Sequence, residues 1–180
     1  MGKKKPANYD LAAITENVLE LSKLSYEAEE KREQSLINQS SQMATAFSFI
    51  SAVILMLFPI ITSTFSDVPL RGLTILSTTI LSLLILSLGL ALLVQWRFKY
   101  QALPSPQVIL DHELKNADDF NTPQQRNKAF VETLNASWES KREVNNRRVR
   151  FIKLSMGIFF IALGIFLCSI IYATIVFSKN

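Results

Sequence analysis

The placement of charge along the chain is the feature that most constrains its fold. Three stretches contain no Lys, Arg, Asp or Glu: 33 residues between Glu33 and Asp67, 25 between Arg71 and Arg97, and 25 between Lys153 and Lys179. The 19 basic and 15 acidic residues of the 180-residue chain all lie outside these stretches. A soluble domain intersperses charged and apolar residues, whereas a membrane protein separates them. The distribution therefore excludes an ordinary soluble enzyme domain.

Each uncharged stretch is long enough to cross a bilayer as a helix, which takes about 20 residues. Lipid satisfies no backbone polar group, so the spans must be helical. We expect an all-α membrane protein with three transmembrane helices and cytoplasmic helical extensions. The predicted segments are a cytoplasmic amphipathic helix (1–42), a transmembrane hairpin (43–96, with spans 43–64 and 72–96), a cytoplasmic helical segment (97–153), a third span (154–176) and a short outer tail (177–180).

The orientation follows from the Lys and Arg counts of the loops, because cytoplasmic loops carry the excess. Residues 1–42 contain six, residues 65–71 one, residues 97–153 eleven and the tail one. The counts predict a cytoplasmic N-terminus and an outward-facing C-terminus.

A basic cluster precedes the third predicted span. Its members are Lys141, Arg142, Arg147, Arg148, Arg150 and Lys153. We expect them to contact anionic lipid headgroups, with a specific lipid or polyanion site as the alternative. Nucleic acid binding is disfavoured, since few aromatic residues are interleaved with these charges.

Small residues occupy definable faces of the second and third predicted spans. Thr74, Thr78, Ser82 and Gly89 share one face of the second, and Gly157, Gly164 and Cys168 share one face of the third. Ser155, Ala162, Ser169 and Ala173 cluster nearly opposite the latter. Small residues let membrane helices approach closely. These faces predict packing within the chain or between copies in a homo-oligomer, and a hydroxyl-lined pore remains an alternative.

Residues 10–42 read as a helix with Asp10 as its N-cap and a narrow apolar stripe. The stripe comprises Leu11, Ile14, Val18 and Leu21. No Gly or Pro lies between Ala7 and Pro59, so this helix is expected to continue into the first span.

Two more helix starts lie in the middle segment. Ser105-Pro106 predicts a short helix over 106–117. Thr122-Pro123-Gln124-Gln125 has capping-box spacing and predicts a helix that continues into the third span. Phe130, Leu134 and Trp138 lie on one face of it, four residues apart. We expect this stripe to be buried in a small cytoplasmic bundle or against a partner protein.

Residues for catalysis, metal binding or cofactor binding are not evident. The single cysteine, Cys168, lies within a predicted span, and the single histidine, His112, stands between Asp111 and Glu113, which point in different directions on a helix. No Gly-rich phosphate loop is present, and the chain is not expected to be an enzyme.

The arrangement resembles the SLATT family, the SMODS- and SLOG-associated membrane effectors of bacterial conflict systems. The resemblance covers about residues 10–150: a cytoplasmic helix, a membrane hairpin closed by Ser66-Asp67-Val68-Pro69-Leu70-Arg71, an aromatic-basic exit at 96–100 and a helical cytoplasmic segment. SLATT proteins have two spans, and this chain adds a third.

The resemblance implies a small antiphage effector of the bacterial inner membrane that oligomerises and permeabilises or depolarises that membrane. A soluble sensor protein encoded nearby would trigger it. The alternatives are a membrane anchor that recruits a soluble partner through its cytoplasmic helices, a holin-like protein, and a small transporter or enzyme subunit.

Overall fold

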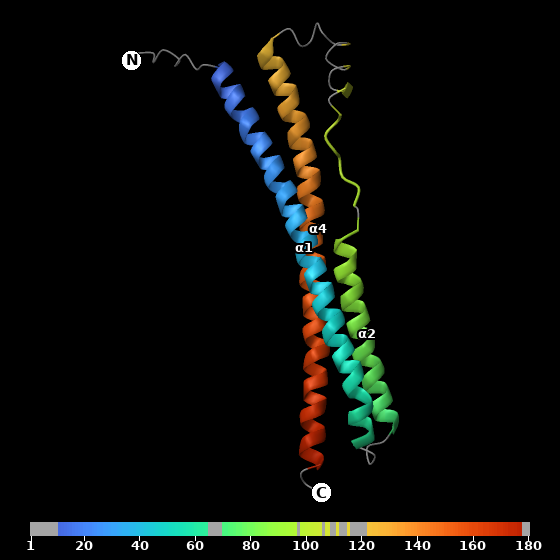
Figure 1. Ribbon diagram of the computed structural model, residues 1–180. Helices are drawn as coiled ribbons and strands as arrows, with labels where there is room; N and C mark the ends of the chain where they lie inside the picture. Colours follow the sequence, from blue (N-terminus) through green and yellow to red (C-terminus); the bar gives the residue numbers. More distant parts are fainter. Residues whose placement is uncertain are drawn as a thin grey trace, which may run out of the picture. The chain divides into compact units, whose positions relative to one another are not determined.

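The computed structural model describes residues 11–64, 70–96, 98–105, 107–108, 111, 115 and 122–177. Three long helices account for most of this part of the chain: α1 (Leu11–Thr64), α2 (Leu70–Val94) and α4 (Pro123–Phe177) (Figure 1). No strand occurs among the described residues. The expected all-helical class is confirmed, and all three helices are long and apolar enough to cross a membrane.

The helix boundaries follow the capping signals of the sequence. The backbone N–H of Gln125 donates to Thr122 Oγ1 (3.3 Å), and that of Thr122 donates to Gln125 Oε1 (3.1 Å), which completes the predicted capping box. Pro123, which has no N–H to satisfy, begins α4. Helix α1 continues unbroken into the first uncharged stretch, as expected from the absence of Gly and Pro before Pro59, and it also extends past Pro59 to Thr64.

Helix α2 ends two residues before the predicted limit of the second span. The N–H groups of Gln95 and Trp96 donate to carbonyl oxygens three residues earlier, at 3.0 and 3.1 Å, which tightens the chain into a turn after Val94. Ser105 Oγ accepts from the N–H of Val108 (3.4 Å), as expected for a cap. Most of the predicted 106–117 helix, Asp10 and residues 178–180 lie outside the described residues.

The chain divides into two compact units. Unit 1 comprises Met1–Glu33 and Phe98–Asn145, and unit 2 comprises Gln34–Arg97 and Asn146–Asn180. Helices α1 and α4 contribute residues to both units, whereas α2 belongs to unit 2.

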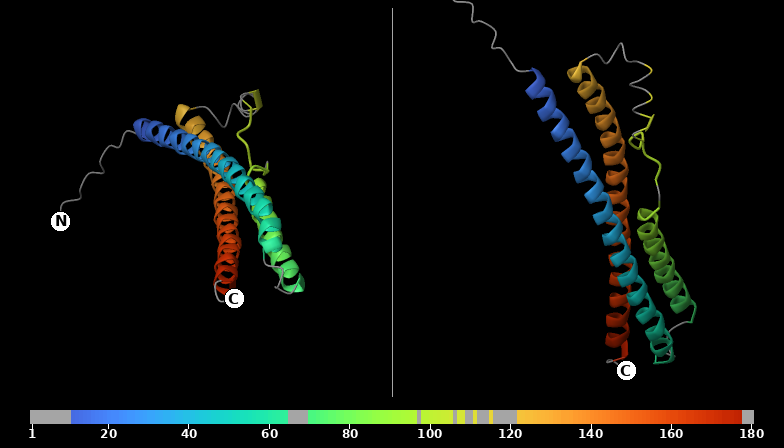
Figure 2. Two further views of the ribbon diagram at one scale, coloured as in Figure 1. Left: turned by 60° about the horizontal axis from the view of Figure 1, so that its bottom comes forward. Right: turned by 45° about the horizontal axis from the view of Figure 1, so that its top comes forward.

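Unit 2 is a three-helix packing in which α2 runs antiparallel to α1 and α4 (Figures 1 and 2). Its core contains Phe47 and Ile54 of α1, Ile80 and Leu84 of α2, and Phe159, Ala162 and Phe166 of α4. The rings of Phe47 and Phe159 stack with centroids 3.9 Å apart. A second cluster joins Leu36, Val94 and Ile152. Buried positions alternate three and four residues apart along α2 and α4, the spacing typical of helices packed as in a coiled coil.

Unit 1 has a polar packing seam. Ser22 of α1 and Ser137, Lys141 and Asn145 of α4 are buried there. The buried apolar side chains among the described residues of this unit are Leu134 and Val144. Hydrogen bonds and charge pairing therefore contribute much of the specificity of this unit.

Candidate functional site

Lys141 places a buried positive charge at the centre of unit 1. Its side chain is 2% exposed, and its Nζ lies 3.3 Å from Glu33 Oε2 on α1. The Nζ also lies 4.9 Å from the ring centroid of Tyr26 and 5.3 Å from that of Tyr100. One carboxylate and two aromatic rings thus take the place of water around the ammonium group.

The segment after α2 supplies one wall of this charge site. Tyr100 lies on residues 98–105, and the next backbone N–H, that of Gln101, donates to Ser140 Oγ of α4 (3.0 Å). This hydrogen bond holds the segment against α4, one residue from Lys141. The same stretch of chain brings the ring of Tyr100 beside the ammonium group.

The same surroundings shift the pKa of the Tyr26 phenol. Burial raises the pKa of its phenol above the ordinary value of 10.0, because the charged phenolate is poorly solvated there. The positive charge of Lys141 lowers this pKa, whereas Tyr100, Glu30 and Glu33 raise it, so the net shift is upward.

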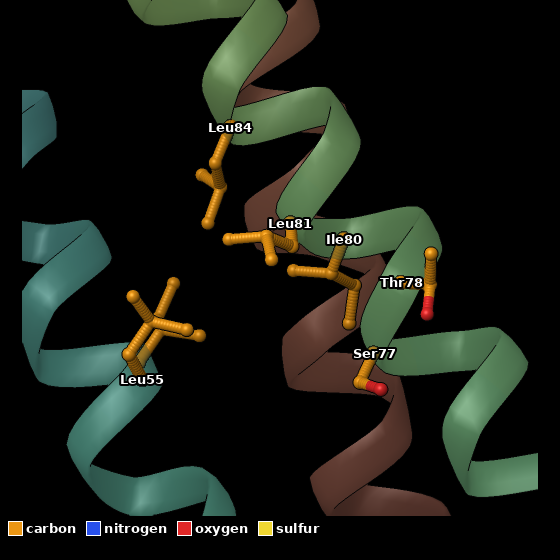
Figure 3. Close-up of a pocket in the computed structure, with 7 residues that line it drawn as sticks. Leu55, Ser77, Thr78, Ile80, Leu81 and Leu84 are labelled. Carbon is orange, nitrogen blue, oxygen red and sulfur yellow. The ribbon is translucent and has the colours of Figure 1, made fainter.

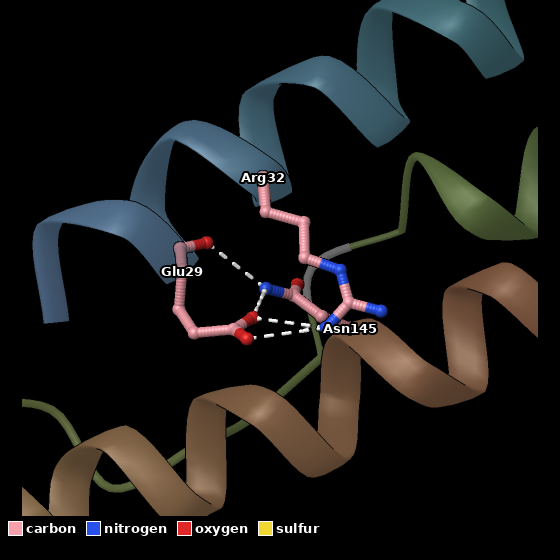
Figure 4. Close-up of polar contacts among 3 residues, drawn as sticks. All are labelled: Glu29, Arg32 and Asn145. Atoms are coloured by element: carbon pink, nitrogen blue, oxygen red, sulfur yellow. Dashed lines mark hydrogen bonds and ion pairs between the residues drawn. The ribbon is translucent and has the colours of Figure 1, made fainter. Parts of the chain in front are cut away.

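A second polar contact joins α1 and α4 within unit 1 (Figure 4). Asn145 is fully buried, and its Nδ2 donates to the backbone oxygen of Glu29 (3.0 Å) and to Glu29 Oε2 (2.9 Å). Arg32 Nη1 donates to the same carboxylate at 3.1 and 3.4 Å. A buried Asn in a helical seam favours the one register in which its amide is satisfied.

Two members of the predicted headgroup-binding cluster are not on the surface. Lys141 is enclosed as described, and Arg148 is also 2% exposed, with its Nη2 donating to the backbone oxygen of Trp96 (3.4 Å). Trp96 follows the end of α2, where carbonyl oxygens lack helical partners, so a guanidinium is well suited to satisfy one. The expectation of lipid contact is therefore corrected for these two residues.

The other four members of the cluster are accessible. Arg147, Arg150 and Lys153 are exposed, and Arg142 is exposed with its guanidinium 5.1 Å from the ring centroid of Trp138. Contact of these four with anionic headgroups stays a prediction.

The predicted Phe130–Leu134–Trp138 stripe lies in unit 1. Leu134 is buried, while Phe130 and Trp138 are half-buried. Leu134 is thus covered within the chain, and docking of a partner on this stripe stays a prediction.

The predicted apolar stripe of α1 is not the packing face of unit 1. Val18 is 42% exposed and Leu21 is 63% exposed, while the side chains of Leu11 and Ile14 lie outside the description. Instead α1 turns Ser22, Tyr26, Glu29 and Glu33 toward α4 and the 98–105 segment. The reason is that Lys141 and Asn145 are buried and need the carboxylates that Glu33 and Glu29 provide.

Unit 2 contains reciprocal hydrogen bonds between α2 and α4. Ser87 Oγ donates to the backbone oxygen of Ser155, and Ser155 Oγ donates to that of Ser87, each at 2.8 Å. On α1, Ser40 Oγ donates to the backbone oxygen of Ala91. Such bonds require the helix backbones to lie close together, and small residues at these positions allow that approach.

The two predicted small faces point away from this core. Thr74, Thr78, Ser82 and Gly89 of α2 and Gly157, Gly164 and Cys168 of α4 are all exposed. A Cβ added at Gly89, Gly157 or Gly164 would meet nothing within 4 Å. In the third predicted span it is the other small face, with Ser155 and Ala162, that packs within unit 2.

The exposed hydroxyl groups of α2 bond to their own helix. Thr78 Oγ1 donates to the backbone oxygen of Thr74, and Ser82 Oγ to that of Thr78, both at 2.8 Å. A cavity of about 220 Å³ lies beside them, between Ile54 and Leu55 of α1 and the 77–84 stretch of α2 (Figure 3). Ser77 Oγ at its edge likewise donates within α2, to Thr74 at 2.9 Å. The hydroxyl groups of Ser77, Thr78 and Ser82 are thus hydrogen-bonded within α2, and a hydroxyl-lined pore stays a prediction.

Neither a metal-ligand cluster nor a similarity to known proteins assigns a chemistry to the described residues. Among the residues that the structure describes, no group of three or more His, Cys, Asp or Glu side chains is placed to hold a metal ion. No protein-family model, no curated protein and no solved structure matches this chain.

Proposed function

We propose that the chain is an integral protein of the bacterial inner membrane, with the apolar parts of α1, α2 and α4 as its three transmembrane helices. The exposure of large apolar side chains supports this proposal. Phe49 is 70% exposed and Met56 is 73% exposed on α1, and similar residues cover α2 and α4 in unit 2. An apolar surface of this kind would promote association in water, whereas lipid solvates it. The loop charges favour a cytoplasmic N-terminus and a periplasmic C-terminus.

Within that membrane we propose an oligomeric effector that permeabilises or depolarises the bilayer. The observation that carries this proposal is the exposure of the small faces of α2 and α4. In lipid, helices associate through small residues that admit a neighbouring backbone. Because unit 2 packs through other faces, these small faces remain available to a second copy. The resemblance to SLATT effectors supports a role in antiphage defence, triggered by a soluble sensor protein.

A membrane anchor is the second candidate. It is favoured by the exposure of Val18, Leu21 and Leu24 on α1 in unit 1, which lies outside the uncharged stretches. An apolar surface in the cytoplasm is a natural contact for a soluble partner.

Inducible expression in bacteria, read with a membrane-potential dye, tests the effector proposal. Wild-type protein should depolarise the cells. Gly157→Leu with Gly164→Leu should abolish depolarisation by holding copies apart, while insertion into the membrane is retained. Ala46→Leu is the matched control, since Ala46 is exposed on α1 of unit 2 and belongs to neither small face. Loss of depolarisation with Ala46→Leu as well, or its persistence in the double Gly variant, would remove the role of the small face.

A further inference from the structure

Two exposed basic residues of unit 2, Arg150 and Lys153 on α4, have no acidic residue to neutralise them. In the sequence of this unit, 34–97 and 146–180, the one acidic residue is Asp67, which follows α1. Among the residues that the structure describes, neither Arg150 nor Lys153 takes part in an ion pair. Unit 2 therefore presents a net positive charge at this point of α4.

The acidic residues of unit 1 that share α4 do not compensate this pair either. The nearest along the helix is Glu143, seven residues before Arg150, whereas helical ion pairs form three or four residues apart. Glu143 has that spacing to Arg147 instead. Arg150 and Lys153 also lie about 140–160° around the helix from the buried Ser155, so they face away from the contact with α2.

The depth of Lys153 makes an isolated charge costly in lipid. Arg148 Nη2 donates to the backbone oxygen of Trp96, just after the end of α2. Ser155 exchanges hydrogen bonds with Ser87, seven residues before that end. Lys153 lies between these two levels, about 7 Å past Arg148 and about one turn inside the end of α2. An exposed charge at this depth is stabilised when the side chain reaches a polar group near the membrane surface.

The face of α4 that continues from Lys153 into the apolar part is exposed and apolar. Phe160 is 59% exposed and Leu167 is 50% exposed. They follow Lys153 at intervals of seven residues, so the three side chains fall within an arc of about 40°. A soluble anion would neutralise the charges but leave Phe160 and Leu167 uncovered. A second copy docked along the same line would place two further cations beside the first two.

We propose that Arg150 and Lys153 bind the phosphate of one anionic phospholipid, whose acyl chain packs along Phe160 and Leu167. The phosphate accepts charge-assisted hydrogen bonds from the guanidinium and the ammonium group. The acyl chain covers the apolar side chains below them. The site selects an anionic over a zwitterionic headgroup, because the two cations have no other counter-charge in unit 2. This proposal rests on the membrane location proposed above, but not on the effector role.

Quenching by brominated lipid tests the proposal on the full-length protein, with one copy in each nanodisc. Cys168→Ser removes the native thiol, and a bimane fluorophore is attached at Ile161→Cys. Ile161 is 58% exposed on α4, about 12 Å past Lys153. The discs contain phosphatidylcholine with a small fraction of either brominated phosphatidylglycerol or brominated phosphatidylcholine. We expect the phosphatidylglycerol to associate roughly tenfold more tightly.

A fluorophore at Phe49→Cys, also with Cys168→Ser, is the matched control for position. Phe47 stacks on Phe159, so Phe49 of α1 lies at about the level of Ile161. Phe49 is 70% exposed and has no charged residue on its side of the uncharged stretch 34–66. The two brominated lipids should therefore quench this fluorophore equally.

Removal of charge gives the decisive comparison. Arg150→Gln with Lys153→Gln should reduce the preference at Ile161→Cys to less than about twofold. Arg126→Gln with Lys128→Gln is the matched control, since it removes one Arg and one Lys from exposed positions about 35 Å away along α4. This control should keep the full preference.

Equal quenching by the two lipids at Ile161→Cys, with Arg150 and Lys153 in place, would overturn the proposal. So would an equal loss of preference in both charge variants. Saturable binding of inorganic phosphate to the protein in phosphatidylcholine discs, abolished by Arg150→Gln with Lys153→Gln, would reassign the basic pair to a soluble anion. Absence of quenching by either lipid at both positions would overturn the membrane location as well, whereas equal quenching leaves that location standing.

Discussion

Replacing Ser155 by Leu should destabilise unit 2 far more than replacing Gly164 by Leu, although both sites lie on α4 and the sequence places both on small faces. Ser155 is fully buried and exchanges two hydrogen bonds of 2.8 Å with Ser87. A Leu at this position must push α2 and α4 apart. At Gly164 an added Cβ meets open space.

The magnitudes follow from these surroundings. Overpacking a close helix contact costs about 1–3 kcal/mol. The hydrogen bond donated by Ser155 contributes about 0.6 kcal/mol more in a membrane helix pair. Ser155→Leu should therefore lower the free energy of unfolding by about 1.6–3.6 kcal/mol. Gly164→Leu should change it by less than about 0.5 kcal/mol, aided by the better helix propensity of Leu.

Unfolding of the purified monomer in mixed micelles by titrated denaturing detergent, followed by circular dichroism, measures both values. Ser155→Ala is the control for loss of the hydroxyl alone and should lie between wild type and Ser155→Leu. Comparable destabilisation by Gly164→Leu and Ser155→Leu, or none by Ser155→Leu, would refute the assignment of packing faces.

Three further outcomes follow from the polar contacts. Lys141→Met should lower the free energy of unfolding by about 3 kcal/mol, which is the low end for removing one partner of a buried ion pair because Glu33 remains partly exposed. Adding Glu33→Leu should recover part of this loss. No recovery in thermal melting would argue against the ion pair. The raised pKa of Tyr26 means that the folded state holds the phenolic proton more tightly, so the stability that Tyr26 contributes below pH 10.0 should be lost as pH rises above it. Tyr26→Phe should make the loss of stability at alkaline pH smaller, which thermal melting against pH measures, and an unchanged pH dependence would argue against the raised pKa. Arg148→Gln should lower stability by about 1–3 kcal/mol, whereas the exposed Arg150→Gln should have little effect, and equal melting of the two variants would contradict the buried contact with Trp96.

The helical class and most helix ends were predictable because they depend on local signals. The uncharged stretches set the length of the apolar segments, and the Thr122–Gln125 box fixed the start of α4. Helix α2 ends two residues before the predicted limit of the second span, because the N–H groups of Gln95 and Trp96 bond to carbonyl oxygens three residues earlier, which composition alone does not reveal.

The polar seam was not predictable from the apolar pattern. Lys141 and Arg148 lie in a run of basic residues that look alike in sequence. These two are buried because they contact residues far away in the chain, which the sequence alone does not reveal. The spacing of Ser22, Tyr26, Glu29 and Glu33 is a coiled-coil spacing, but these residues are polar, and the apolar periodicity of this helix falls on Val18 and Leu21 instead. The sequence likewise offered two small faces on the third span with nothing to say which would pack.

The effector account is tested most directly by reconstituting the purified protein in liposomes that hold a potassium diffusion potential. A potential-sensitive dye reports whether the potential survives, while crosslinking reports the oligomeric state in the same sample. We expect wild-type protein to dissipate the potential when crosslinked oligomers are present, and the Gly157→Leu, Gly164→Leu variant to leave it intact as a monomer. Liposomes that keep their potential despite wild-type oligomers would contradict the account.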